Sequence, residues 1–107
     1  LANQDQIPLM VFDEIDAIIH ERARLAIVSA LAVSSELSFN ELKGSLSLTD
    51  GNLSAHARTL EDAGYVAIKK TFRGRRPYTT LRLTRKGRAA FQNYVAMLKR
   101  VVEGSSE

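Results

Sequence analysis

The chain has 107 residues, which fits one domain, and its 45% hydrophobic and 25% charged residues are ordinary for a soluble globular protein. It has no cysteine, which excludes disulfides, thiolate zinc sites and cysteine nucleophiles. The net charge is only +3, but it is unevenly distributed, because residues 1–57 carry −5 and residues 58–100 carry +10. This asymmetry indicates a polyanionic partner on one face of the protein.

Nothing in the chain predicts a membrane protein or a secreted one. No apolar run approaches the ~20 residues that cross a bilayer. No basic and then apolar segment, the mark of a secretion signal, opens the chain. Together with the absence of cysteine, these features favour a cytoplasmic protein without a membrane partner.

The N-terminal third is expected to contain two helices. Residues 1–10 form a loose lead-in, and residues 11–34 carry apolar side chains at helical spacing. The first helix is short and covers about 10–19, and the second covers 22–33. The predicted buried residues of the second helix are Leu25, Ile27, Val28, Leu31 and Ala32.

Residues 39–64 have the pattern of a helix-turn-helix. Ser38 and Glu41 have capping-box spacing and start a short helix over 39–45. Thr49 is the next N-cap, with Asp50 in the first turn, and Gly64 is a left-handed C-cap beyond a helix that ends near residue 63. The expected core stripe of this second helix is Leu53, Ala57 and Leu60. The residues expected to face away from the core are Gly51, Ser54, Ala55, Arg58 and Asp62.

Residues 65–83 predict a basic β-hairpin. Apolar and polar residues alternate around 66–68 and around 81–83, so two antiparallel strands are expected, joined through Gly74 and Pro77. A further short strand near residues 36–38 is expected to pair with them. Between residues 65 and 90 there is no acidic residue, and there are nine basic ones: Lys69, Lys70, Arg73, Arg75, Arg76, Arg82, Arg85, Lys86 and Arg88.

A long amphipathic helix is expected to close the chain. Thr84 caps this helix, which covers 84–103 and has a wide apolar stripe. The helix and the N-terminal segment carry more apolar side chains than a small core can cover. We therefore expect a two-fold homodimer, with a small-molecule effector possible at its interface. The predicted dimerisation residues are Phe12, Ile15, Ile19, Phe91, Tyr94, Val95, Leu98 and Val102.

This order of elements predicts a mainly α protein with a small β-hairpin (α+β). We interpret it as one winged helix-turn-helix domain over residues 1–107, with N- and C-terminal dimerisation helices. In this fold the N-terminal half of the second helix of the motif, here 49–58, enters the major groove of double-stranded DNA. Asn52 has the donor and acceptor that suit adenine, and Arg58 is long enough to reach a phosphate or a guanine.

The arginines of the hairpin tip are expected to enter a minor groove or to clamp phosphates. The full predicted DNA-binding set is Thr49, Asn52, Ser54, His56, Arg58, Arg73, Arg75 and Arg76. Thr49 also has a role as a plain helix cap. His56 lies beside the core stripe, where it either contacts the DNA backbone or packs as a neutral histidine. The hairpin tip has an alternative role as a solvated turn that protects the sheet edge from aggregation.

No catalytic or metal-binding constellation is present in the sequence. His20 and His56 are the only histidines, and neither has a second ligand four residues further on. Paired carboxylates, nucleophile–base pairs and a P-loop are missing as well. The sequence therefore predicts neither an enzyme nor a metal or cofactor site. The alternative to a DNA-binding regulator is a protein-interaction module with an acidic partner.

Three segments, in this order, resemble parts of bacterial and archaeal regulators. Residues 19–27 contain the pattern His-x-x-x-Arg-Leu-x-Ile, and residues 48–66 resemble a recognition helix. Residues 72–77, followed by Leu-Thr-x-x-Gly at 83–87, resemble a wing and the entry to a final helix. Over about residues 13–100 the chain is similar to the compact winged helix-turn-helix transcriptional regulators of the MarR/ArsR-like superfamily.

The resemblance implies a dimeric regulator, such as a repressor, that binds operator DNA. The family pattern turns four residues of the recognition helix towards DNA: Asn52, Ser54, His56 and Arg58. Metal-sensing ArsR proteins usually carry a cysteine pair, which this chain lacks, so thiolate metal sensing is excluded. The family usually has a large aliphatic residue at position 57. Ala57 leaves a gap there that Phe72 or Tyr65 is expected to fill.

Overall fold

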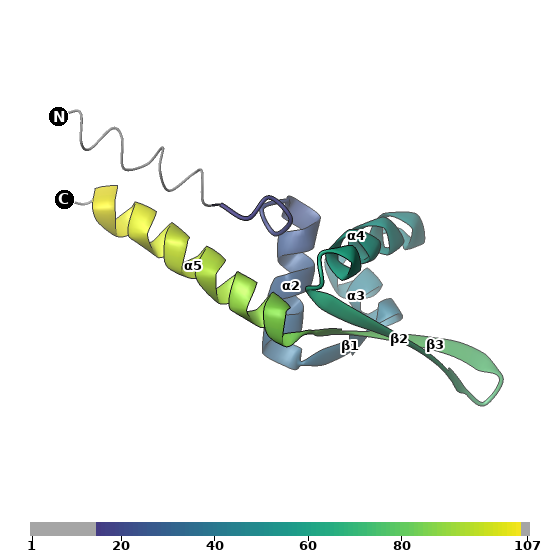
Figure 1. Ribbon diagram of the computed structural model, residues 1–107. Helices are drawn as coiled ribbons and strands as arrows, with labels where there is room; N and C mark the ends of the chain where they lie inside the picture. The colour runs from purple at the N-terminus through teal and green to yellow at the C-terminus, as the bar shows by residue number, and fades with distance from the viewer. Residues whose placement is uncertain (1–14, 106–107) are drawn as a thin grey trace.

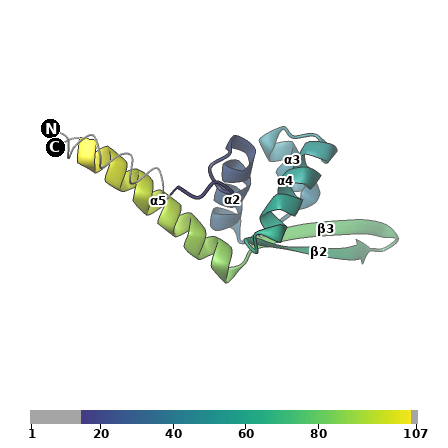
Figure 2. The same ribbon diagram turned by 45° about the horizontal axis from the view of Figure 1, so that its top comes forward.

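The computed structural model describes residues 15–105. Predictions that fall on residues 1–14, including the lead-in, the start of the first helix and Phe12, lie outside the described range. The described elements are α2 (Arg22–Ser34), β1 (Glu36–Ser38), α3 (Phe39–Leu46), α4 (Asp50–Asp62), β2 (Val66–Arg73), β3 (Arg76–Leu83) and α5 (Arg85–Ser105). The predicted order of helix-turn-helix, hairpin and final helix is confirmed. Helices α2, α3 and α4 pack together, and α5 and the β2–β3 hairpin project from them in opposite directions (Figures 1 and 2).

The described end of the first predicted helix is a turn, so that part of the prediction is wrong. Residues 15–21 have no helical assignment. The carboxylate Oδ1 of Asp16 accepts hydrogen bonds from the backbone N–H groups of Ile18, at 2.8 Å, and Ile19, at 3.2 Å. The backbone N–H of His20 donates to the Asp16 carbonyl at 2.8 Å. An Asp side chain that binds nearby N–H groups in this way favours a turn over a helix.

The helix-turn-helix follows the sequence prediction closely. Both bonds of the capping box are present, from Glu41 N to Ser38 Oγ at 3.0 Å and from Ser38 N to Glu41 Oε1 at 2.7 Å. The Oγ1 atom of Thr49 accepts from Asn52 N at 3.1 Å and caps α4. Helix α4 then ends before Gly64, whose φ of 82° is left-handed, as predicted.

One hydrophobic core lies beneath these helices and the sheet. The apolar residues predicted to be buried on α2 and α4 lie in this core, except that Leu25 and Ala32 are only half-buried. Its fully buried members include Ile27, Val28, Leu31, Leu42, Leu53, Leu60 and Leu81. The gap beside Ala57 is not filled by Phe72, because that side chain is 71% exposed. Tyr65, the other predicted candidate, is among the partly buried residues that pack on the core.

The sheet has three antiparallel strands in the order β1-β3-β2. The predicted third strand is confirmed, since β1 pairs with residues 80–82 of β3. The hairpin is longer than expected: Arg73 faces Arg76, so only Gly74 and Arg75 form the loop. Gly74 has a φ of 64°, the left-handed value that a two-residue hairpin loop with Gly first requires.

Pro77 lies within β3 and not in the loop. It faces Phe72, one position beyond the closing pair of the hairpin. Because hydrogen-bonded and non-hydrogen-bonded pairs alternate along an antiparallel ladder, the Pro77 nitrogen points away from β2. Strand β1 does not extend to this position, so a proline here removes no bond from the sheet.

The start of α5 is fixed against the junction between α4 and β2. Thr84 Oγ1 accepts from Gly87 N at 2.9 Å and donates to the Gly64 carbonyl at 2.6 Å. Thr84 N donates to the Tyr65 carbonyl at 3.0 Å. Gly87 lies so close to this backbone that an added Cβ would be 2.0 Å from the carbonyl oxygen of Tyr65. Only glycine fits at this position.

We expect Gly87→Ala to destabilise the fold by about 3 kcal/mol or more, because backbone atoms cannot yield as a flexible side chain does. Gly44→Ala is the matched control, since nothing lies within 4 Å of a Cβ added at that exposed α3 position. It should stabilise α3 by up to about 1 kcal/mol. Urea unfolding followed by circular dichroism measures both. Equal stability of the two variants would contradict the close approach of Gly87 to Tyr65.

Candidate nucleic-acid interface

The exposed side of α4 has two flanks separated by a ridge of small side chains. Gly51 and Ala55 are exposed on the ridge, opposite the buried stripe. Ser54 and Arg58, four residues apart, lie on the flank towards the hairpin and line a groove there. Asn52 and His56 lie on the other flank and line a hollow that is shared with the start of α2. The predicted residues of α4 therefore lie on one helix but on two sides of its ridge.

The groove between α4 and the hairpin has a volume of about 500 Å³. Its lining residues are Phe39, Ser54, Arg58, Glu61, Ile68, Lys70, Thr79 and Leu81. Two cations line it from separate elements, Arg58 from α4 and Lys70 from β2, and Glu61 is the one carboxylate among the lining residues. Helix α4 and the hairpin thus border the same groove.

The strand register assigns each hairpin side chain to one of two faces. Ile68, Lys70 and Phe72 alternate along β2 on the face of the groove. Arg73 and Arg76 face each other on the opposite side. Like charges directly across a ladder repel, so this pair is easier to understand beside an anion.

The three predicted hairpin arginines have different surroundings. The guanidinium carbon of Arg73 lies 3.8 Å from the centre of the Tyr78 ring, in a cation–π contact that holds this side chain on its face. Arg76 is exposed on the same face, and Arg75 is exposed in the loop itself. Arg75 and Arg76 make no contact in the described part of the chain that would restrain them as Tyr78 restrains Arg73.

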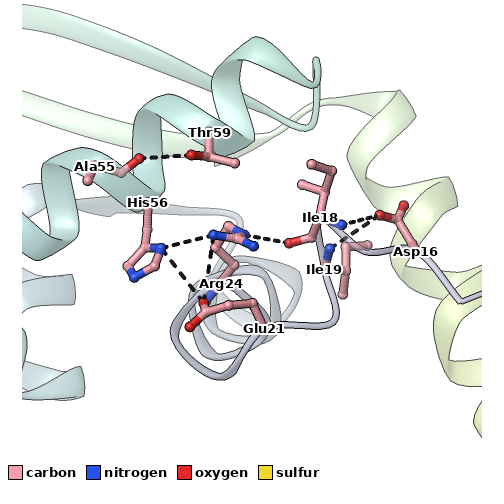
Figure 3. Close-up of polar contacts among 8 residues, drawn as sticks. All are labelled: Asp16, Ile18, Ile19, Glu21, Arg24, Ala55, His56 and Thr59. Atoms are coloured by element: carbon pink, nitrogen blue, oxygen red, sulfur yellow. Dashed lines mark hydrogen bonds and ion pairs between the residues drawn. The ribbon is translucent and has the colours of Figure 1, made fainter.

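His56 is held in a polar cluster with two residues of the α2 start (Figure 3). Its Nδ1 lies 3.2 Å from Arg24 Nη1 and 3.7 Å from Glu21 Oε1. A guanidinium only donates, so Nδ1 accepts in the shorter contact. The Nε atom of Arg24 also donates to the Ile18 carbonyl at 2.6 Å. His56 is therefore held at the core boundary, with 24% of its side chain exposed, and its predicted contact with the DNA backbone stays a prediction.

Glu21 is both the N-cap of α2 and a member of this cluster. Its Oε1 accepts from the Arg24 backbone N–H at 2.8 Å. This hydrogen bond lowers the pKa of Glu21 below its usual value of 4.5, and the charge of Arg24 acts in the same direction against desolvation. Sequence analysis missed Glu21 and Asp16. Arg24 belongs to the His-x-x-x-Arg pattern of the sequence, but no structural role was predicted for it.

The turn before α2 also contacts the end of α4 and the final helix. The Tyr65 hydroxyl donates to Asp16 Oδ2. Burial of the phenol, together with this bond, raises the pKa of Tyr65 to about 12, so the hydroxyl stays a donor. On the other side, His20 Nδ1 and Tyr94 Oη of α5 are 2.8 Å apart. Residues 16–24 therefore connect α4, the junction between α4 and β2, and α5.

The predicted dimerisation residues within the described range divide into three groups by exposure. Val95, Leu98 and Val102 are 47%, 37% and 68% exposed on α5. Ile15 and Phe91 are half-buried. Ile19 and Tyr94 are 0% and 3% exposed within the single chain, so they have no surface to offer a second copy. These two residues pack inside the domain.

Within residues 15–105 there is no group of three or more His, Cys, Asp or Glu side chains placed to hold a metal ion. None of the helices described there is both long and apolar enough to span a bilayer.

The fold, the shared groove and the basic hairpin define a winged helix DNA-binding protein. Residues 23–102 match the family model described as "Winged helix DNA-binding domain", and the chain belongs to that family. It is 43% identical over 72 residues to an uncharacterised protein of Methanocaldococcus jannaschii. The aligned segment covers 67% of this chain and 78% of that protein.

Solved structures of transcriptional regulators have the same fold. The chain is similar to a transcriptional regulator homologue from Pyrococcus horikoshii, with a TM-score of 0.84 and 27% identity over 95% of this chain and 99% of that one. A MarR mutant from E. coli, solved in complex with operator DNA, has a TM-score of 0.64 and 17% identity over 94% of this chain and 77% of that one. The winged helix domain that the resemblance implied is confirmed, and a DNA-binding transcriptional regulator is the class that these likenesses support.

We expect Glu21→Gln to lower stability at pH 7 by at most about 1 kcal/mol, because the carboxylate is about one third exposed and screened by solvent. The folded state lowers the pKa of Glu21, so its contribution is present above the usual value of 4.5 and is lost as the pH falls through the folded value. The difference between variant and parent should therefore close below pH 4.5, as urea unfolding at several pH values would show. Glu61→Gln, at an exposed carboxylate, is the control, and its difference in stability from the parent should not change with pH in this way. A gap that persists in acid would contradict the capping role.

Proposed function

We propose that this protein is a sequence-specific DNA-binding transcriptional regulator that places the N-terminal half of α4 in the major groove and the hairpin tip on the adjacent minor groove. The observation that carries this proposal is the groove shared by α4 and the hairpin, with Arg58 and Lys70 on its two sides. The phosphodiester strand between a major and a minor groove is a polyanion with a groove on either side of it. A protein that contacts both DNA grooves must let this strand pass between its two reading elements, and cations there neutralise the phosphates. The groove between α4 and the hairpin has that position.

Helix α4 is suited to a close approach to base edges. The ridge of Gly51 and Ala55 adds little bulk, so the helix axis can approach the groove floor. On the flanks, Asn52 and Ser54 are exposed and carry donors and acceptors. Thr49 can combine its two predicted roles, because Oγ1 accepts from Asn52 N while its O–H remains able to donate to a phosphate. His56, fixed by Arg24, is proposed to contact the backbone at the edge of the site.

A homodimer through α5 completes the proposal. The helix projects away from the rest of the domain (Figures 1 and 2), and Val95, Leu98 and Val102 form an exposed stripe at helical spacing along it. Covering this stripe with the same stripe of a second copy would bury apolar surface by two-fold symmetry. Two recognition helices related in this way would read a pseudo-palindromic site, with half-sites about one helical turn or a multiple of it apart.

The double variant Arg75→Ala/Arg76→Ala should bind its DNA site at least roughly tenfold more weakly, and the slope of log affinity against log salt should fall by about 2. Both effects follow if each arginine releases counterions from the phosphates that it meets. Fluorescence anisotropy on a duplex selected from random-sequence DNA, repeated over a salt series, measures them.

The matched control is Arg82→Ala/Lys99→Ala, which removes the same charge from exposed positions outside the groove and the hairpin tip. Its affinity and slope should stay close to those of the parent. Equal effects of the two double variants would mean that net charge alone drives binding, and would contradict the hairpin's role. A folded parent protein that binds no duplex but binds an acidic protein would instead favour the protein-interaction alternative.

Leu98→Glu should convert the homodimer to a monomer at micromolar concentration, because two carboxylates would meet in an apolar interface without partners. Sedimentation equilibrium measures the mass directly. Gln92→Glu, at an exposed α5 position outside the predicted dimerisation set, should leave the dimer intact. A parent protein that sediments as a monomer, or an unchanged mass for Leu98→Glu, would contradict the α5 interface.

A further inference from the structure

The hairpin tip carries a large apolar side chain among its cations. Phe72 is 71% exposed, and it is the one aromatic residue among the large apolar side chains that the structure leaves exposed in residues 15–105. The other such side chains lie on α2 or on the α5 stripe. Phe72 is not needed to complete the core, because it lies at the far end of β2 beyond the groove residue Lys70. An aromatic ring held in water at this place needs another explanation.

The hairpin backbone directs Phe72 towards the same side as the groove. It shares a face with Lys70, and Pro77 lies directly opposite it on β3. Pro77 is exposed as well, so the two side chains form a small apolar ridge beyond the groove. Arg73 does not cover this ridge, since its guanidinium is stacked on Tyr78 on the other face. The ridge therefore stays free for a partner.

The side chains of the hairpin tip can donate hydrogen bonds but cannot accept them. From Phe72 to Pro77 the side chains are Phe, Arg, Gly, Arg, Arg and Pro, which include donors and apolar groups but no hydrogen-bond acceptor. In the minor groove an A·T pair presents only acceptors, adenine N3 and thymine O2. A G·C pair adds the guanine N2 amino group, a donor that stands out from the groove floor. The tip can donate to the acceptors of an A·T pair, but it has no acceptor for the guanine amino group.

We propose that the hairpin tip selects A·T pairs in the minor groove, with Phe72, supported by Pro77, packing on the sugar walls where a guanine amino group would obstruct it. This inference rests on the proposed DNA-binding function and adds a specificity-determining residue to it. The free arginines Arg75 and Arg76 donate to the acceptors of the A·T pairs. Phe72 makes the contact that requires the groove floor to be free of an amino group.

The experiment uses the full chain and the duplex that the parent protein selects from random-sequence DNA. Each base pair that flanks the segment contacted by α4 is set in turn to A·T, to G·C or to inosine·C. Inosine lacks the N2 amino group, so inosine·C has the minor groove of A·T and the major groove of G·C. The parent should bind A·T and inosine·C equally and G·C roughly five- to tenfold more weakly at the positions under the tip.

Phe72→Ala should bind the A·T duplex more weakly with an unchanged salt slope, because no charge is lost. Its preference for A·T over G·C should shrink to about twofold. Val33→Ala, which truncates another exposed apolar side chain at the end of α2, is the matched control and should change neither quantity. Thermal unfolding of both variants should stay near that of the parent, because neither side chain is buried.

Three results would overturn the inference and leave the DNA-binding proposal in place. The parent protein would show no A·T preference beside the α4 site. Inosine·C would behave like G·C, which would mean that the preference is read in the major groove. Phe72→Ala would keep the full preference, which would assign it to the arginines alone. A parent protein that binds no duplex at all would overturn the proposed function as well, and so differs from these three.

Discussion

The backbone at Gly64 and Tyr65 fixes the relative positions of the elements that border the groove. The left-handed φ of Gly64 turns the chain from α4 directly into β2. The same two residues accept hydrogen bonds from Thr84, which holds the start of α5 there, and Gly87 lies against the Tyr65 carbonyl. The Tyr65 side chain then binds Asp16 of the turn before α2. Because α4, the hairpin, α5 and the N-terminal turn meet at two residues, the width of the groove depends on this junction.

Positive charge at this junction and at the hairpin tip is arranged in a way that the fold alone does not require. Arg85, Lys86 and Arg88 lie in the first turn of α5, where positive charge opposes the helix dipole. Lys86 Nζ lies 5.8 Å from the centre of the Tyr65 ring, which returns part of that cost. The facing pair Arg73 and Arg76 is a second unfavourable arrangement. Both become favourable beside a polyanion, which links the local electrostatics to the proposed function.

Local signals in the sequence were sufficient to predict most of the fold. Ser38, Thr49 and Gly64 mark helix ends through contacts with residues at most three positions away. Such short-range patterns can be recognised in the sequence itself. The first helix was predicted wrongly in its described part because the apolar spacing up to Ile19 is compatible with either a helix or a buried turn. The Asp16 side chain decides between them by binding two backbone N–H groups.

The candidate site was predicted as residues but not as an arrangement. The split of α4 into two flanks follows from helical geometry, yet which flank faces the hairpin depends on the turn at Gly64. Lys70 was counted only as one more basic residue, because its place opposite Arg58 in the groove follows from strand register. The cluster of Glu21, Arg24 and His56 joins residues up to 35 positions apart and left no periodic signal. The exposure of Phe72 likewise depends on the length of the hairpin.

The central claim is that α4 and the hairpin grip one DNA duplex together, and chemical footprinting tests it most directly. Dimethyl sulfate reports on guanine N7 in the major groove and adenine N3 in the minor groove, the positions that the two elements would cover. On the selected duplex, each half-site should show protected N7 positions flanked, about half a helical turn away, by protected N3 positions. Protection confined to one groove, or spread evenly along the duplex, would contradict the joint use of the helix and the hairpin.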